Sequence, residues 1–273
     1  MIVSQLIKPE TASQFSWSEI WNARNMIYNL IRSSALLPYR DTYFSYFWTL
    51  LRPFIFLLVI VFIKQRSMAQ MGEEIPYPLF LYSGLILWWY IVDAIRQSAR
   101  SAFTYKGLIT KIYFPRIITP LVPVIGRLFD LGIQALGVGV MMVLFSRYPD
   151  GHFFLLPLLF FNVILLCLGV GYLFAIASVF FRDMERILDY ILYVGFFISP
   201  VIYAIELVPP EYRYLYSWLN PTAGPLMAFR ATLFSGVTPN YQALVHSIIV
   251  SIVLFFVGIF VFQRLQSTLP ERM

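Results

Sequence analysis

The stretch FFLLPLLFFNVILLCLGVGYLFAIASVFF, residues 153–181, decides the fold class of this chain. It has 29 consecutive residues without a charged side chain. A helix needs about 20 mostly apolar residues to cross the hydrocarbon core of a bilayer. A longer segment must tilt or extend beyond the membrane. Residues 153–181 therefore predict a transmembrane helix.

Five more apolar segments lie on either side of this one. Each has at most two charged residues, and they are residues 43–63, 75–95, 117–145, 187–205 and 241–263. Gly195 and Pro200 interrupt the segment 187–205. Pro200 is expected to kink its helix because proline donates no backbone hydrogen bond. We predict an all-α integral membrane protein with six transmembrane helices.

The composition of the whole chain agrees with a membrane protein. Of 273 residues, 59% are hydrophobic, 18% are aromatic and 12% are charged, and the mean hydropathy is +0.73. A typical soluble domain has about a quarter charged residues. A soluble enzyme, a disordered chain and a disulfide scaffold are therefore nearly excluded. The single cysteine, Cys167, is expected to be a small buried hydrophobe.

Positive charge is distributed unevenly between the two sets of connecting segments. The chain has 20 Lys and Arg against 14 Asp and Glu, a net charge of +6. Thirteen of these cations lie in the N-terminal arm, after spans 2 and 4 and in the tail, against five in the other connections. Cytoplasmic loops are enriched in Lys and Arg, so we expect both termini in the cytoplasm. The excess is interpreted as a signal of orientation and not of nucleic-acid binding.

The first 42 residues are expected to form a cytoplasmic arm with an interface helix. They lack the apolar core of a cleavable signal peptide, so the first span is expected to direct insertion. Residues 16–37 have amphipathic spacing, with a capping box at Ser16 and Glu19 and an expected end at Pro38. Tryptophans and arginines suit a helix in the headgroup layer, in contact with membrane lipids. Packing on the protein's own bundle is the alternative.

Two connecting segments are more apolar than simple loops. Residues 105–116 (YKGLITKIYFPR) are either a basic cytoplasmic loop or a short helix that docks into a partner. Residues 206–240 contain two apolar pieces separated by Pro and Gly breakers, and pieces of about ten residues are too short to span a bilayer. They form either a re-entrant helical pair packed against protein on the outer face or a surface-lying loop.

Enzyme motifs are mostly absent. The sequence has no P-loop, no nucleophile elbow and no metal-ligand spacing around His152 or His246. The chain is therefore not expected to be an enzyme or to bind a cofactor or metal itself. His246 is expected to pack against a neighbour inside its span, and a proton relay is the alternative.

Charged residues inside the predicted spans are costly and therefore informative. Arg127 and Asp130 can pair locally, three residues apart on one helix. Arg52 has no acid within its own span, and it either binds an anionic ligand from the cytoplasm or extends to the headgroups. The acids of the spans do not cluster in sequence, which argues against an ion-coupled carrier.

Aromatic residues gather near the ends and middles of several spans. Some are expected to form interfacial belts. Others could line a path for sugars, since aromatic faces stack on sugar rings and tyrosine hydroxyls bond sugar hydroxyls. The candidate channel aromatics are Tyr43, Tyr46, Trp48, Trp88, Trp89, Tyr90, Tyr193, Phe196, Phe197 and Tyr203.

Several short motifs occur in a recognisable order. They are Ser45-x-x-Trp48-x-x-x-x-Pro53, Phe181-Arg182-Asp183, Ser199-Pro200-Val201-Ile202-Tyr203 and Asn220-Pro221. Together with the amphipathic helix and the basic loop, this order resembles the transmembrane subunit of ABC-2 type exporters. It is most similar to the branch that exports lipid-linked polysaccharides such as O antigen, capsule and teichoic acid. Ser45 and Arg52 depart from the family pattern, which often has Gly at the first position and an acid or amide at the second.

The resemblance implies how such a chain is assembled and driven. Two copies would pair as a homodimer, and two separate ATPase subunits, which bind ATP and Mg, would dock from the cytoplasm. Residues 206–240 would close the outer end of the channel. Candidates for the ATPase-coupling contact are Tyr105, Lys106, Lys111, Tyr113, Phe114 and Arg116. Candidates for the arginines that meet lipid pyrophosphate at the entry are Arg24, Arg32 and Arg52.

The sequence therefore predicts a single ABC-2 type transmembrane domain over residues 1–273. Its parts are the arm 1–42, spans 1–5 at 43–205, the extracytoplasmic re-entrant segment 206–240, and the last span with the cytoplasmic tail at 241–273. The expected function is export of a lipid-linked polysaccharide across the bacterial inner membrane. An ABC-2 drug or small-lipid exporter is the first alternative. A membrane enzyme acting on polyprenyl phosphates is the second.

Overall fold

The computed structural model describes residues 21–40, 44–67, 75–111, 115–149 and 151–269. The secondary structure of these residues is helical, and they contain no strand. The helices are α2 (Arg24–Arg40), α3 (Ser45–Ser67), α4 (Tyr77–Ala99), α5 (Ser101–Thr104), α6 (Lys106–Lys111), α7 (Ile118–Gly126), α8 (Leu128–Leu144), α9 (Leu156–Phe180), α10 (Met184–Ile198), α11 (Pro210–Leu219), α12 (Ala223–Leu233) and α13 (Tyr241–Leu265). Short 3-10 turns lie at Gly151–Leu155, Ile205–Leu207 and Gln266–Thr268.

Five of the six predicted spans are confirmed as helices long and apolar enough to cross a membrane. The third of them consists of α7 and α8, which meet at Arg127. The five segments are Ser45–Ile63, Tyr77–Ala99, Ile118–Leu144, His152–Phe180 and Tyr241–Thr268.

The predicted span 187–205 is wrong in its bounds. Helix α10 has 15 residues and ends at Ile198, where Ser199 takes an extended conformation (φ −80°, ψ 149°). The reason is Pro200, whose ring disfavours helical backbone at the residue before it and which donates no hydrogen bond. The kink expected at Pro200 is therefore a helix end, followed by an irregular segment that leads to α11.

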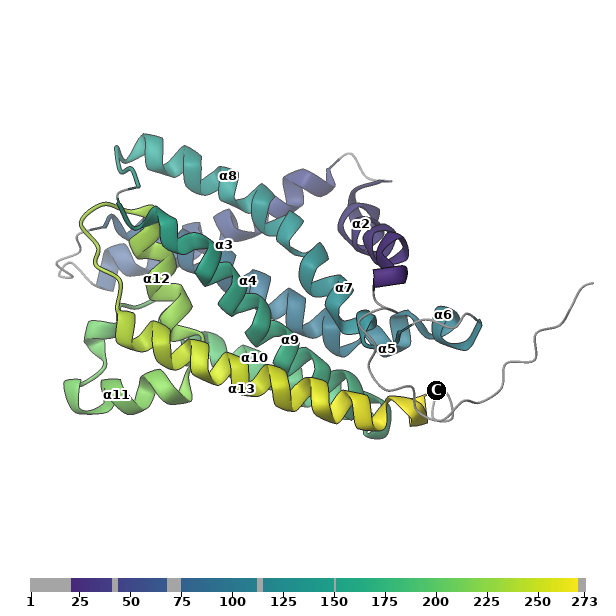
Figure 1. Cartoon of the computed structure of the whole chain (residues 1–273). Coiled ribbons are helices and arrows are strands. Elements are labelled where there is room, and N and C mark those ends of the chain that lie inside the picture. Colours follow the sequence, from purple (N-terminus) through teal and green to yellow (C-terminus); the bar gives the residue numbers. More distant parts are fainter. Residues whose placement is uncertain (1–20, 41–43, 68–74, 112–114, 150, 270–273) are drawn as a thin grey trace, which may run out of the picture.

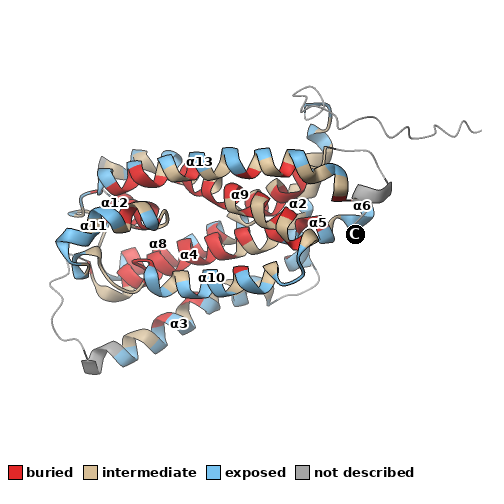
Figure 2. Ribbon diagram, turned by 90° about the horizontal axis from the view of Figure 1, so that it is seen from below, coloured by how far each residue is buried: buried red, intermediate tan, exposed pale blue. Residues whose placement is uncertain are grey.

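Helix α4 forms the centre of the molecule. Of its 23 residues, 18 are buried. It packs against α3, α7, α8, α9, α10 and α12, and Figure 2 shows its buried residues surrounded by the other helices. Helices α9 and α13 lie side by side (Figure 1). Gly169 and Gly258 permit this approach, because a Cβ at Gly169 would lie 2.6 Å from the Leu254 carbonyl carbon.

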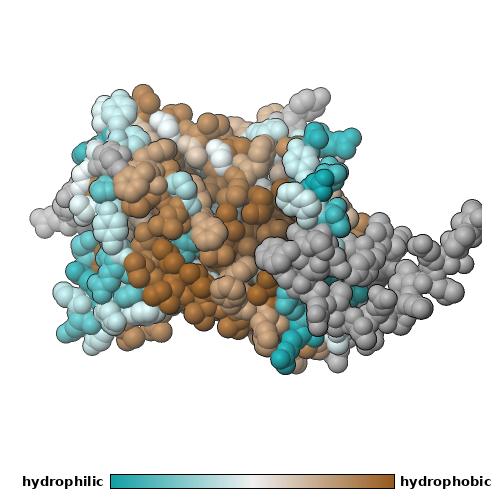
Figure 3. Space-filling model, in the orientation of Figure 1, coloured by the Kyte–Doolittle hydropathy of each residue, from teal (hydrophilic) through white to brown (hydrophobic). Residues whose placement is uncertain are grey.

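The two ends of the bundle differ. Helices α2, α5 and α6 and the C-terminal end of α13 gather at one end, and α11 and α12 lie at the other (Figures 1 and 2). The face in Figure 3 has a broad apolar band between two hydrophilic ends. This distribution is the one expected of a multi-pass membrane protein. The assignment of the α2 end to the cytoplasm stays a prediction.

Helix α2 differs from its prediction at its end. It continues through Pro38 to Arg40, so the expectation that Pro38 ends it is wrong. Proline is tolerated here because only the last turn loses a bond, and the Pro38 carbonyl accepts from the Ser45 hydroxyl at 2.7 Å. One face of α2 packs on α7, whereas Tyr28 on α2 and Trp21, which lies just before the helix, are exposed. The helix therefore packs on the bundle and also has an exposed aromatic face. Residues 16–20, with the predicted capping box, lie outside the described residues.

The segment 206–240 contains two short helices, α11 and α12, as its two apolar pieces indicated. Pro209-Pro210 begins α11, and Asn220-Pro221 separates the two helices. Most of α12 is buried against α4, α9 and α13, so this part is not a surface-lying loop. Entry of the pair into the outer leaflet stays a prediction.

Candidate functional site

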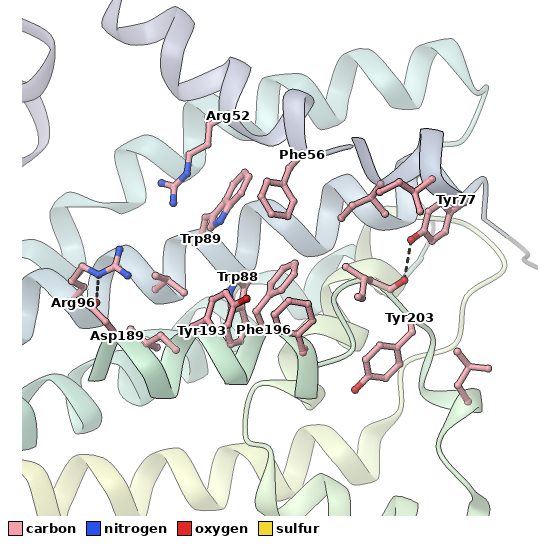
Figure 4. A pocket seen from close by; sticks show the side chains of 17 residues that line it. Arg52, Phe56, Tyr77, Trp88, Trp89, Arg96, Asp189, Tyr193, Phe196 and Tyr203 are labelled. Atoms are coloured by element: carbon pink, nitrogen blue, oxygen red, sulfur yellow. Dashed lines mark hydrogen bonds and ion pairs between the residues drawn. The ribbon is translucent and has the colours of Figure 1, made fainter. Parts of the chain in front are cut away.

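A groove lies between α3, α4 and α10, with a volume of about 580 Å³ (Figure 4). We call it the aromatic groove. The six rings that define it are Phe56, Trp88, Trp89, Tyr193, Phe196 and Phe197. Neighbouring rings contact one another: Phe56 meets Trp89 edge-on at 5.5 Å between centroids, and Phe196 lies 6.1 Å from Trp88. The rings thus form a continuous apolar surface.

Local helix geometry explains why these rings converge. Residues three or four apart share a helix face, and Trp89, Val92 and Arg96 on α4 have this spacing. Asp189, Tyr193 and Phe196 repeat it on α10. Gly195 lets the two helices approach, because a Cβ there would lie 3.1 Å from the Trp88 ring.

Charged side chains alternate along one end of the groove. Arg52 pairs with Asp93 at 3.1 Å, Arg96 bonds Asp189 at 2.7 Å, and Arg100 bonds Glu185 at 2.9 Å. Longer contacts of 3.9 Å (Arg96–Asp93) and 3.8 Å (Arg100–Asp189) complete the alternation. We call these six residues the charged row. Three positive and three negative groups cancel formally, and they connect α3, α4 and α10.

The charged row changes the interpretation of Arg52. Neither alternative considered from the sequence included a partner for it, yet Asp93 on the neighbouring helix pairs with it. The guanidinium also lies 4.5 Å from the Trp89 ring centroid, within range of a cation–π contact. The partner was missed because 41 residues separate the two positions. The matched spacings of Asp93, Arg96 and Arg100 on one helix and Glu185 and Asp189 on another were the available signal.

Tyrosine hydroxyls mark the opposite end of the groove, towards α11. The Tyr77 hydroxyl donates to the Ile202 carbonyl at 3.0 Å, as the dashed line in Figure 4 shows. Tyr203 and Tyr216 both donate to the Ile198 carbonyl, Tyr216 at 2.6 Å. These bonds satisfy backbone carbonyls that the end of α10 leaves open.

Six of the ten candidate channel aromatics line the groove, namely Trp88, Trp89, Tyr193, Phe196, Phe197 and Tyr203. Tyr90 points away from it and donates to the Val124 carbonyl at 3.1 Å. Tyr46 stacks on Tyr39, with ring centroids 4.4 Å apart. Trp48 is 61% exposed on α3 and does not line the groove. Tyr43 lies outside the described residues.

A second hollow of about 480 Å³ lies beside α2. We call it the α2 hollow, and Arg32, Arg40, Tyr39 and Tyr46 line it. The Tyr39 hydroxyl donates to Asp130 at 2.5 Å, and burial, followed by this bond, raises the pKa of Tyr39. The same carboxylate pairs with Arg127 at 2.5 Å, which confirms the local pair predicted from the sequence.

The three candidate entry arginines do not meet in one place. Arg32 lines the α2 hollow and Arg52 lines the aromatic groove. Arg24 bonds the Trp21 carbonyl at 3.1 Å near the start of α2. The structure therefore places on separate surfaces the three arginines that the sequence had combined.

The candidate ATPase-coupling segment includes the short helix α6 at the same end as α2 (Figure 1). Tyr105, at the junction of α5 and α6, is half-buried, and burial raises its pKa. Lys106 is exposed, and Lys111 is the last residue of α6. Arg116 donates to the Gln266 carbonyl at 2.6 Å, which ties this segment to the end of α13. Tyr113 and Phe114 lie outside the described residues.

Two polar residues of the interior are satisfied by neighbours. His246 Nδ1 lies 2.6 Å from the Ser217 hydroxyl, and its ring stacks on Trp218 at 4.2 Å. The expected packing of His246 against a neighbour is therefore confirmed, and the proton relay stays an untested alternative. Cys167 is buried in α9, also as expected. Among the described residues, no three His, Cys, Asp or Glu side chains are grouped closely enough to hold a metal ion.

The fold and the groove define a multi-pass α-helical membrane protein with an aromatic groove beside its central helix. No family model matches the chain. Curated relatives match most of it. It is 26% identical to the O-antigen export system permease protein RfbA of Myxococcus xanthus, over 93% of this chain and 97% of that one.

The chain is also similar to further curated proteins, one of which is named for transport of a different polysaccharide. An O-antigen export system permease protein RfbA of Klebsiella pneumoniae is 26% identical, over 85% of this chain and 89% of that one. The polysialic acid transport protein KpsM of Escherichia coli is 23% identical, over 82% and 87%. The resemblance to ABC-2 type permease subunits for polysaccharide export, stated from the sequence motifs, is confirmed.

Proposed function

We propose that this chain is the permease subunit of an ABC exporter that moves a lipid-linked polysaccharide out across the bacterial inner membrane. The observation that carries the proposal is the aromatic groove. The groove has a volume of about 580 Å³, and the rings spaced along it can stack on successive sugar rings. Such contacts tolerate different sugars, because every pyranose has an apolar face. The named functions of the relatives support this substrate class.

Two surfaces are proposed to bind two parts of the substrate. The charged row is formally neutral, so the groove suits the glycan more than a pyrophosphate. In the α2 hollow, Arg32 and Arg40 have no ion-pair partner among the described residues. Arginine binds phosphate oxygens in pairs, so this hollow suits the lipid pyrophosphate. Arg24, at the start of α2, does not line this hollow.

The groove is proposed to be completed by a second copy of the chain. Exposed apolar side chains cover α3 and α10, on both sides of the groove; examples are Leu58, Phe62, Tyr190 and Val194. A homodimer would cover these faces and enclose the path. Energy would come from separate ATPase subunits that hold ATP and Mg and dock on the segment around α6, at the end proposed to be cytoplasmic.

Deletion and complementation test the proposal. A strain without this chain should lose its surface polysaccharide and regain it when the full chain and its ATPase are restored. Phe196→Ala should restore much less, because Phe196 contacts three other rings of the groove. Phe161→Ala, 59% exposed on α9 away from the groove, is the matched control and should restore export fully.

The same strains distinguish the alternatives. Intact surface polysaccharide in the deletion strain, with ATPase stimulation by hydrophobic drugs in the purified complex, would favour a drug or small-lipid exporter. Turnover of a polyprenyl phosphate by the purified chain without an ATPase would favour a membrane enzyme. Either result contradicts polysaccharide export.

A further inference from the structure

Arg230 on α12 is a buried arginine, with 3% of its surface exposed. Burying a guanidinium costs free energy unless its donors are satisfied. Its Nη1 donates to the Pro200 carbonyl at 2.7 Å and its Nη2 to the Val201 carbonyl at 2.9 Å. Its Nε donates to the Phe80 carbonyl at 3.2 Å. One side chain therefore joins α12, α4 and the segment after α10.

Two of the three carbonyls that Arg230 binds, those of Pro200 and Val201, lie just after the end of α10. Beyond Ile198 the chain no longer bonds itself as a helix, so side chains of other elements satisfy the open carbonyls. Arg230 takes two of them, and Tyr77 takes that of Ile202. Ile202 and Tyr203 line the aromatic groove at its α11 end. Arg230 does not itself line the groove, but it fixes the backbone that leads into this wall.

Gly84 on α4 provides the space for this guanidinium. A Cβ at Gly84 would collide with Arg230 Nη2 and lie 3.0 Å from the Val201 carbonyl oxygen. The Arg230 guanidinium also lies 3.5 Å from the Phe80 ring centroid, one turn earlier on α4. The rigid, planar fork is therefore held in one orientation by α4 and directed at two successive carbonyls. A lysine cannot reproduce this arrangement with a single ammonium group.

We propose that Arg230 is a positioning residue that fixes the α11 end of the aromatic groove and couples it to α12. It acts through the backbone of Pro200 and Val201. A displacement of α12 moves these carbonyls, and with them Ile202 and Tyr203 in the groove wall. The role in transport rests on the proposed function. The coupling between α12 and the groove wall is a property of the chain without substrate or ATPase.

Thiol labelling measures the coupling directly. Val201 is fully buried, so a Val201→Cys variant should react slowly with a maleimide in permeabilised membranes that contain the full chain. Adding Arg230→Lys should raise the labelling rate about tenfold, because local opening exposes this backbone. Adding Gly84→Ala should do the same, since it displaces the guanidinium without removing the charge.

Two matched controls and one internal thiol complete the design. Arg213→Lys removes an arginine that also donates to two carbonyls, those of Val208 and Glu206, but only within its own segment. Gly139→Ala adds a methyl group where nothing lies within 4 Å. Neither should change labelling of Val201→Cys. Cys167, buried in α9, should stay unlabelled in every variant.

The outcomes are separable from those of the export experiments. Labelling at the control rate in both Arg230→Lys and Gly84→Ala would overturn the proposal. Labelling of Cys167 as well would also overturn it, because Arg230 would then support the whole bundle and not one wall. Because no substrate, ATPase or membrane orientation enters the measurement, the coupling can be found even if the chain does not export polysaccharide.

Discussion

Helices α3 and α4 have the same length and similar apolar sequences, but opposite surroundings. Both have 23 residues. In their most apolar 18-residue windows, 83% of the α4 residues are buried inside the chain, against 11% in α3. Helix α4 is the core and is surrounded by other helices, whereas α3 contacts few elements and lies at the edge (Figure 2). Hydrophobicity therefore predicts that both lie in the membrane, but not which one the fold depends on.

Different interactions hold the two helices against the rest of the chain. Helix α4 is held by close packing of apolar side chains and by small residues such as Gly84. Helix α3 is held near the groove by Phe56 and by the Arg52–Asp93 pair. In lipid, apolar contact with tails competes equally with apolar contact between helices, so packing and polar contacts decide. A weakly held α3 beside the groove is suited to move or to pair with a second copy.

The largest difference is expected from truncation of one leucine in each helix. Leu85→Ala in α4 removes a fully buried side chain and should lower the free energy of unfolding by about 2 kcal/mol or more. Leu58→Ala in α3, 67% exposed, should change it by less than about 0.5 kcal/mol. Reversible unfolding of the full chain in mixed micelles measures both. Equal losses would show that the edge position of α3 is wrong.

A smaller effect is expected from the charged row. Arg100 and Glu185 connect α4 to α10 and are about a third to a half exposed, so their coupling should be at most about 1 kcal/mol. Arg100→Glu alone should destabilise the chain, and Glu185→Arg in addition should restore part of the loss. A double-mutant cycle isolates this pairwise coupling energy.

The control for this cycle is the pair Asp183 and Arg186, which lies within one helix region and is 80% and 83% exposed. Its coupling should be near zero. Coupling of the same size in both pairs would mean that the row does not join α10 to the core.

Span positions could be predicted from the sequence because the bilayer sets their length directly. Runs of about 20 apolar residues leave few alternatives, and five predicted spans are confirmed. The end of α10 could be predicted only in part. Pro200 indicated an interruption, but Arg230, 30 residues further on, satisfies the Pro200 carbonyl. No local pattern encodes such a partner, so a complete break and a kink look the same in sequence.

The sequence predicted which types of residue line the groove, but not which aromatic side chains point into it. Trp89 faces the groove, and Tyr90, the next residue, faces the α7 side and bonds Val124. The difference depends on which neighbours surround α4, and aromatic composition does not contain that information. The pairing of Arg52 with Asp93 depends in the same way on the register between α3 and α4.

A small effect on stability, with the clearest effect on function, is expected for Arg52. Its side chain is 48% exposed, so Arg52→Ala should change the free energy of unfolding by less than about 1 kcal/mol and leave assembly of the proposed dimer intact. Export of surface polysaccharide should nevertheless fall, because the guanidinium lies against Trp89 at the charged end of the groove. Arg52→Lys should give an intermediate result, since an ammonium keeps the Asp93 pair but not the flat stacking surface. Quantifying surface polysaccharide and assembly in the same cells checks this, and unchanged export in Arg52→Ala would remove Arg52 from the site and leave it as a tether of α3 alone.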